Sequence, residues 1–196
     1  MFTGIIEEMG EVIDVQHEGT NVHFTVNSPL SKEFHEDQSV SHNGVCLTVT
    51  HVHPDSHRVT AVKETLEKSN LGSWKKGTLV NIERSMSANG RFDGHIVQGH
   101  VDQKAVCTFV KEEDGSWLYH FNYPASFAHL MVEKGSVCIN GVSLTCFNTS
   151  EAGHFSVAII PYTYEHTNFR QLKEGNEVNI EFDILGKYIA KMQGMK

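Results

Sequence analysis

The histidines of this sequence are its most numerous candidates for metal binding or proton transfer. There are thirteen of them, and one close group is His51-x-His53-x3-His57. Its spacing matches neither the HExxH motif nor a Cys/His zinc pattern, so we predict no metal site. The group surrounds Pro54-Asp55-Ser56, a sequence typical of a surface hairpin. We therefore interpret these three histidines as solvated loop residues.

A second pair of histidines has glycines beside it, in Gly94-His95 and Gly99-His100. Glycine allows a ligand to approach the backbone closely. Imidazole gains and loses a proton near neutral pH, which suits it to proton transfer. This segment is therefore a candidate ligand site.

Cys46 is a candidate thiol nucleophile. Such a thiol normally needs a base and an orienting partner, and no thiol-protease signature surrounds it. A buried strand cysteine is the alternative, and the spacing favours it. The sequence contains neither GxxxxGK[ST] nor a GxGxxG that opens a helix, which argues against nucleoside triphosphates and dinucleotide cofactors.

The elements that must position these groups occur twice. Asn43-Gly44-Val45-Cys46-Leu47-Thr48 returns 97 residues later as Asn140-Gly141-Val142-Ser143-Leu144-Thr145. The segment 77–83 returns at 175–181 in the same order. A long period that runs through the chain once indicates a duplicated domain. We predict one domain over residues 1–95, a second over 96–183, and a tail over 184–196.

Within each copy, short alternating segments rich in β-branched residues predict strands, separated by Asn-Gly and Asp-Gly turns. About six strands in so short a length favour a small closed barrel, because closure removes exposed sheet edges. The tail has helical spacing of apolar residues from 184 to 192. The four segments that leave room for short helices are 30–35, 64–70, 125–132 and 164–171.

Composition excludes several classes of partner and location. The net charge of −8 argues against nucleic acid and anionic membranes. The N-terminal segment carries Glu7 and Glu8 where a signal peptide has a cationic start, and no apolar run approaches the length of a membrane span. We therefore expect a cytoplasmic protein, whose four cysteines without CxxC spacing are reduced.

Polar residues also recur at matching places in the two copies, and the mismatches between copies carry information. Ser39 matches Ser136, Thr48 matches Thr145, and Thr65 matches Thr163. Where the copies differ, Cys46 corresponds to Ser143, Ile5 to His100 and Ser85 to Asp183. Duplicated barrels can keep the same turn and strand residues because both copies need them to fold, and this explains pairs such as Asn81 with Asn179. Two similar pockets with different titratable groups could bind two copies of one molecule and treat them differently.

These motifs resemble the riboflavin synthase family, whose members are built from two lumazine-binding repeats. The resemblance rests on Met1–Glu7, Ser41–Val49, Lys63–Leu66 and Gly99–Asp102 in the first copy and junction, and on the segments 134–135, 140–145 and 160–161 in the second. It implies an all-β protein of two tandem six-stranded antiparallel Greek-key barrels with a short C-terminal helix. It also implies a homotrimer; the sequence leaves association with lumazine synthase open.

The resemblance further implies a transferase reaction. Two molecules of 6,7-dimethyl-8-ribityllumazine exchange a four-carbon unit, which gives riboflavin and 5-amino-6-ribitylaminouracil. Because this dismutation is balanced within the substrate pair, no cofactor is expected. The family site lies between the first barrel of one subunit and the second barrel of its neighbour.

Matching motif to motif implies which residues line the two pockets. They are Gly4, Ile5, Ile6, Cys46, Leu47, Thr48, Thr60, Ala61, Val62, Lys63, Glu64, Thr65, Gly99, His100, Val101, Lys134, Ser143, Leu144, Thr145, Ile160, Pro161, Tyr162, Thr163, Tyr164 and Glu165. We assign proton transfer at the lumazine 7-methyl group to His100. Ser39, Cys46 or a water that they hold would activate the acceptor, and Ser143, Thr145 and Asp183 would bind the ribityl chain and orient the donor.

The alternative is a non-catalytic antenna protein of the same fold, which holds one lumazine or flavin chromophore. Such relatives tend to lose polar residues in one repeat. Here Ser39, Cys46, His100, Ser143, Thr163 and Asp183 are all present, and this favours the enzyme.

Overall fold

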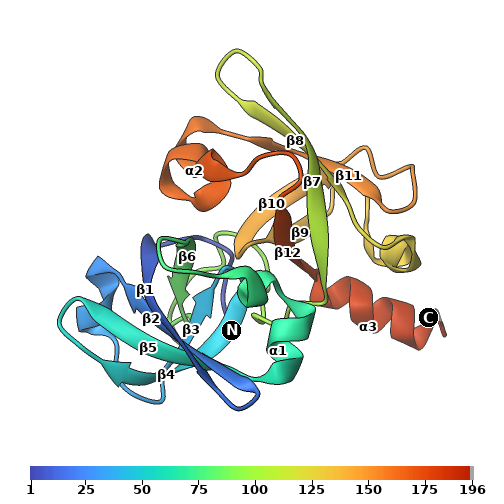
Figure 1. Ribbon diagram of the computed structural model, residues 1–196. Coiled ribbons are helices and arrows are strands. Elements are labelled where there is room, and N and C mark those ends of the chain that lie inside the picture. Colours follow the sequence, from blue (N-terminus) through green and yellow to red (C-terminus); the bar gives the residue numbers. More distant parts are fainter. Residues whose placement is uncertain (195–196) are drawn as a thin grey trace.

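Two closed antiparallel barrels make up the described part of the chain, residues 1–194 of the computed structural model (Figure 1). The first contains six strands: β1 (Glu8–Glu18), β2 (Asn21–Asn27), β3 (Ser39–His42), β4 (Val45–Val52), β5 (Ser56–Ala61) and β6 (Leu79–Arg84). The second contains β7 (Gln103–Glu112), β8 (Trp117–Asn122), β9 (Ser136–Ile139), β10 (Val142–Phe147), β11 (His154–Ile159) and β12 (Glu177–Phe182). Around each barrel the strands follow the same order, β1-β2-β5-β4-β3-β6 and β7-β8-β11-β10-β9-β12. The predicted pair of duplicated barrels is confirmed.

Short helices connect the strands at equivalent places in the two copies. They are the 3-10 turns Pro29–Glu33, Asn70–Ser73, Ala125–Leu130 and Asn168–Gln171, and the α-helices α1 (Lys63–Lys68) and α2 (Pro161–His166). All four segments predicted to have room for helices contain one. The helix α3 (Ile184–Met192) forms most of the predicted tail, and residues 195 and 196 of that tail lie outside the described residues. No helix within residues 1–194 is both long and apolar enough to cross a membrane.

The strand hairpins follow directly from local sequence. In β2 the side chains of Val22, Phe24 and Val26 are buried, and the residues between them are more exposed, as alternation requires. The turn between β3 and β4 has positive φ at Asn43 (48°) and Gly44 (77°), the conformation that Asn-Gly adopts in a two-residue hairpin. Asn140 and Gly141 repeat it between β9 and β10.

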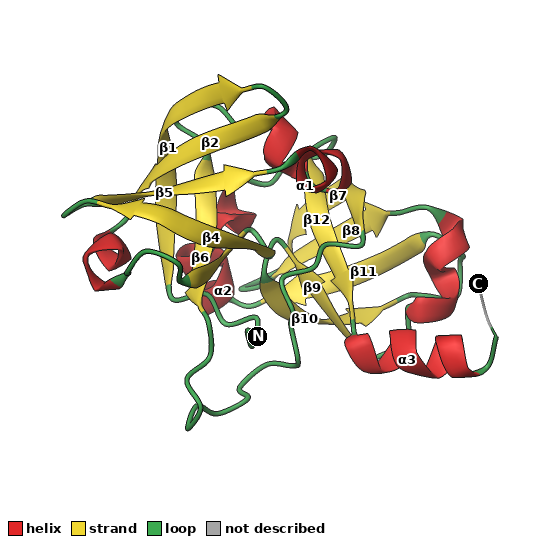
Figure 2. Cartoon of the chain, turned by 90° about the horizontal axis from the view of Figure 1, so that it is seen from below, coloured by secondary structure: helices red, strands yellow, loops and turns green. Residues whose placement is uncertain are grey.

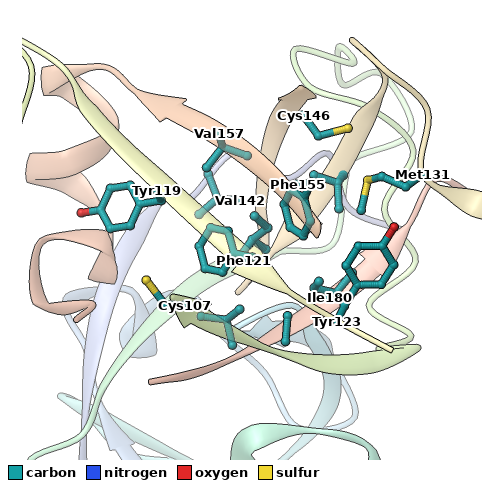
Figure 3. Packing of buried hydrophobic residues seen from close by; sticks show 14 of the residues in the cluster. Cys107, Tyr119, Phe121, Tyr123, Met131, Val142, Cys146, Phe155, Val157 and Ile180 are labelled. Atoms are coloured by element: carbon teal, nitrogen blue, oxygen red, sulfur yellow. The ribbon is translucent and has the colours of Figure 1, made fainter. Parts of the chain in front are cut away.

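Each barrel has its own apolar core. Figure 3 shows part of the second one, where Phe121 and Phe155 stack with ring centroids 5.3 Å apart. Tyr119 is buried beside them, and its hydroxyl donates to the carbonyl of Phe169 at 2.9 Å. In the first barrel, Trp74 packs edge-on against Phe24.

The barrels lie side by side and are joined by buried asparagines (Figure 2). Asn81 of β6 donates through Nδ2 to the carbonyl of Asn140 at 2.9 Å, and Asn179 of β12 donates to the carbonyl of Asn43 at 2.8 Å. Each amide therefore reaches across to the hairpin of the other barrel. This reciprocal contact fits the structural interpretation of the Asn81 and Asn179 pair.

His57 contradicts the interpretation of the first histidine group as solvated. It is fully buried inside the first barrel, where its Nε2 lies 2.7 Å from Nε2 of the equally buried His42. His51 and His53 are exposed, as predicted. The interpretation failed for His57 because its strand, β5, begins at Ser56 and the alternation of the strand turns this side chain inward.

All four cysteines are free, which agrees with the prediction of reduced thiols.

Candidate functional site

Two segments outside the barrels cross each other between them. Phe2 and Val97 pair as an isolated antiparallel bridge, and both side chains are fully buried. Beyond this bridge, Gly4 accepts a backbone hydrogen bond from Ser143 of β10 at 2.8 Å, whereas Gly99 accepts one from Cys46 of β4 at 2.8 Å. The start of the first copy thus contacts the second barrel, and the start of the second copy contacts the first barrel.

Glycine is required at both crossing points. Gly4 and Gly99 have φ of +79° and +78°, which side-chain-bearing residues rarely adopt. A Cβ on Gly99 would lie 2.6 Å from the Cβ of Cys46, and one on Gly4 would lie 2.6 Å from the Cβ of Ser143. The backbone of the crossing segments therefore approaches these two side chains closely.

Two buried carboxylates fix the crossing segments. Glu83 of β6 accepts hydrogen bonds from the backbone N–H of Thr3 (2.6 Å) and of Gly4 (3.0 Å). Glu181 of β12 accepts from the N–H groups of Gln98, Gly99 and His100 at 2.7 to 2.9 Å. Burial raises the pKa of Glu181 to about 7, although these donors and Lys187 oppose the change. Sequence reasoning missed both carboxylates, although each ends the repeated motif Asn-Ile-Glu.

The first site is a cavity of about 210 Å³ where the junction meets the first barrel. It is lined by Val45 and Cys46 of β4, by Glu64, Thr65, Lys68 and Ser69 in and after α1, and by Gly99, His100 and Val101 of the junction. Six residues predicted for the pockets therefore come together here from three separate parts of the chain. His100 is exposed and Cys46 is half-buried, so both can meet a ligand.

The second site is the equivalent surface of the other barrel. Ser143 corresponds to Cys46 of the first site, and its Oγ is 2.7 Å from Nδ1 of His95. Burial lowers the pKa of His95, and the nearby Asp183 carboxylate opposes this. Tyr164 of α2 stacks on Trp117 with ring centroids 3.7 Å apart. The two sites thus differ in chemistry: one has a thiol near an exposed imidazole, and the other has a hydroxyl hydrogen-bonded to a half-buried imidazole.

Comparison with known proteins agrees with this duplicated architecture. A family model described as "Lumazine binding domain" matches twice, over residues 3–85 and 98–183. Riboflavin synthase of Actinobacillus pleuropneumoniae is 40% identical over 192 residues, which cover 97% of this chain and 89% of that enzyme. The chain belongs to the riboflavin synthase family. The riboflavin synthase of Saccharomyces cerevisiae is also 40% identical, with 97% of this chain and 85% of that enzyme covered.

Solved structures confirm the fold of this riboflavin synthase family member. LumP in complex with riboflavin superimposes with a TM-score of 0.86 at 19% identity, over 93% of this chain and 99% of LumP. LumP in complex with 6,7-dimethyl-8-(1'-D-ribityl) lumazine gives a TM-score of 0.84 at 18% identity, with coverage of 92% and 98%.

Other residues predicted for the site do not line the first cavity. Ser39 of β3 pairs with Thr48 of β4, which lies two residues along the strand from Cys46. Thr145 is exposed, and Asp183 caps α3 by accepting from the N–H of Leu185 at 2.9 Å. The exposed residues Ile5, Val62, Ile160, Tyr162 and Glu165 face solvent in the single chain.

Some predicted residues have protein partners of their own. The side chains of Leu47 and Ala61 point into the first core, which leaves their main chain for ligand contact. The Nζ atom of Lys134 lies over the ring of Phe147 at 4.7 Å. Thr60 is hydrogen-bonded to His23, a residue that the sequence did not single out.

Proposed function

We propose that this protein is a riboflavin synthase that converts two molecules of 6,7-dimethyl-8-ribityllumazine into riboflavin and 5-amino-6-ribitylaminouracil. The observation that carries the proposal is the pair of equivalent but chemically unlike sites on a chain of the riboflavin synthase family. A dismutation needs one substrate to give a four-carbon unit and an identical one to receive it. Two sites that differ in their titratable groups can treat the two molecules differently, so that one acts as the donor and the other as the acceptor.

In the proposed mechanism the first step is proton loss from the 7-methyl group of the donor. His100 is exposed at the cavity and is our candidate base. The acceptor lumazine is activated by addition at its ring carbon 7, and Cys46, Ser39 or a water that they hold is the candidate nucleophile. Ser143, Thr145 and Asp183 are proposed to bind the ribityl chain and orient the donor. The pocket residues named from the sequence are proposed to surround both substrates.

The proposed assembly is a cytoplasmic homotrimer in which the two kinds of site face each other across subunits. The C-terminal helix α3 supports this proposal because Leu185, Tyr188, Ile189 and Met192 are each more than half exposed. Such an apolar helix face, on a short helix that projects from the second barrel, fits burial against other copies of the chain (Figure 1). Facing sites would hold the two lumazines in one orientation, so that their encounter becomes effectively unimolecular.

The decisive experiment mixes the purified protein with 6,7-dimethyl-8-ribityllumazine and follows riboflavin absorbance. Formation of one riboflavin for every two lumazines consumed would support the enzyme. Tight lumazine binding without riboflavin formation would instead support the antenna protein. The Cys46→Ala variant then tests the nucleophile: full activity would remove the thiol from consideration and leave a hydroxyl or water.

A further inference from the structure

The outer face of the first barrel continues away from the cavity as a polar surface. Leu47, Val49, Val59 and Ala61 all point into the core, so the residues between them on β4 and β5 point outward. Cys46 lines the cavity, and Thr48 lies two positions further along β4, about 7 Å away at the usual rise of a strand. Val49 pairs with Val59, which places Thr60 on β5 beside Thr48.

The cavity at Cys46 is too small for a whole substrate molecule. Pockets that enclose a small ligand usually measure about 300–1,000 Å³, and this one measures about 210 Å³. Part of a lumazine bound here must therefore extend outside it. The outer face at Thr48 and Thr60 is a path for the polyol chain, because their hydroxyls match its hydrogen-bonding groups.

Thr60 does not stand alone on this surface. His23 lies directly opposite it on β2, and Nδ1 of His23 is 2.8 Å from the Thr60 hydroxyl oxygen. The other ring nitrogen, Nε2, is 2.8 Å from a carboxylate oxygen of Glu18 at the end of β1. The side chain of His23 is 18% exposed and that of Glu18 is 78% exposed. The imidazole is thus hydrogen-bonded to a hydroxyl at one ring nitrogen and to a carboxylate at the other.

For a neutral imidazole, this arrangement sets the direction of the hydrogen bond at Thr60. An ionised carboxylate only accepts, so Nε2 of His23 carries a hydrogen. In the neutral imidazole Nδ1 then has none, and the Thr60 hydroxyl must donate to it. The lone pairs of the Thr60 oxygen remain for a group outside the protein. Thr60 is therefore an acceptor and matches a ligand hydroxyl that donates.

We propose that His23, held by Glu18, positions Thr60 as the acceptor for a hydroxyl of the substrate's ribityl chain and thereby sets substrate affinity. The proposal rests on the proposed function. His23 is a positioning residue here, since it acts through Thr60 and touches neither reacting ring.

The test compares four variants with the wild-type protein by riboflavin formation and by lumazine binding in fluorescence titration. Removal of one hydrogen bond is worth about 0.5–1.5 kcal/mol, which corresponds to a change of about 2- to 12-fold in an equilibrium constant. We expect His23→Leu and Thr60→Val each to raise KM and Kd by about that factor with kcat unchanged. The double variant should be no worse than either single variant, because both remove the same contact. In His23→Asn, the amide oxygen can replace Nδ1 as the acceptor, and affinity should recover.

The matched control is Thr25→Val, two positions along β2 on the same outer face, which should keep the wild-type KM. Wild-type affinity in either single variant, or additive losses in the double variant, would overturn the proposal. So would loss of kcat with unchanged KM, because that result places His23 in the chemistry or in folding. If the wild-type protein binds lumazine but forms no riboflavin, the proposed function fails, and the Kd series still decides the role of His23.

Discussion

The buried pair His42 and His57 should make the first barrel sensitive to acid. Burial lowers the pKa of His42 from 6.5 to about 4, and burial together with the neighbouring His42 lowers that of His57 to about 2. Only one set of neutral tautomers satisfies every bond. His42 donates through Nδ1 to the carbonyl of Val40 and accepts at Nε2 from His57, which in turn accepts at Nδ1 from the hydroxyl of Ser31.

The size of the effect follows from proton binding. Below pH 6.5 the unfolded chain protonates both histidines and the folded barrel protonates neither, so the free energy of unfolding falls as the pH falls. An unfolded histidine is half protonated at pH 6.5 and almost fully protonated at pH 5, so each histidine removes about 1.6 kcal/mol over this range and the pair about 3 kcal/mol. Glu181 acts in the opposite direction, because its raised pKa favours the protonated folded state as the pH falls.

The substitution His57→Gln isolates one histidine. The glutamine amide can donate to His42 and its carbonyl can accept from Ser31, so both hydrogen bonds remain while one titrating group is lost. The variant should lose about 1.6 kcal/mol less than the wild-type protein between pH 6.5 and pH 5. The contribution of Glu181 is common to both proteins and cancels.

Urea unfolding at several pH values would measure this difference. Trp74 is buried in the first barrel, so its fluorescence reports that barrel once Trp117 has been replaced by Phe in every protein compared. His53→Gln in the exposed hairpin is the matched control and should follow the wild-type pH dependence. Equal pH dependence in the wild-type and His57→Gln proteins would refute the reasoning.

Three further predictions concern the site and the assembly. Gly94→Ala should lower both riboflavin formation and the melting temperature, because its Cβ would lie 2.1 Å from the carbonyl oxygen of Thr3; the control Gly72→Ala, whose nearest neighbour is at 3.6 Å, should be tolerated. His100→Ala should lower turnover by about 10²- to 10⁴-fold in stopped-flow absorbance with little change in lumazine binding, and unchanged turnover would remove it as the base. Tyr188→Glu should convert the proposed trimer into monomers in analytical ultracentrifugation and abolish activity, whereas a fully active monomer would contradict a site shared between subunits.

Much of the fold could be predicted from the sequence because its determinants are local. Alternation of apolar residues defines strands such as β2, and Asn43-Gly44 selects the hairpin turn wherever it occurs. Because the same motifs recur in the second copy, the same conclusions hold there. The short strand β3 was not identified as a separate segment because Ser39–His42 contains a single large aliphatic residue and gives little periodic signal.

The sequence by itself determined the duplication, the strands and turns, and the residue types that distinguish the two sites. Only the tertiary structure decided which of these residues meet, because the meetings join distant parts of the chain: Glu83 binds Thr3 from 80 residues away, and Gly99 lies against Cys46 of the first barrel. It also decided that His57 is buried and that His23 holds Thr60. Such contacts depend on how closed barrels pack against each other and against the crossing segments, and no local pattern of residues encodes that geometry.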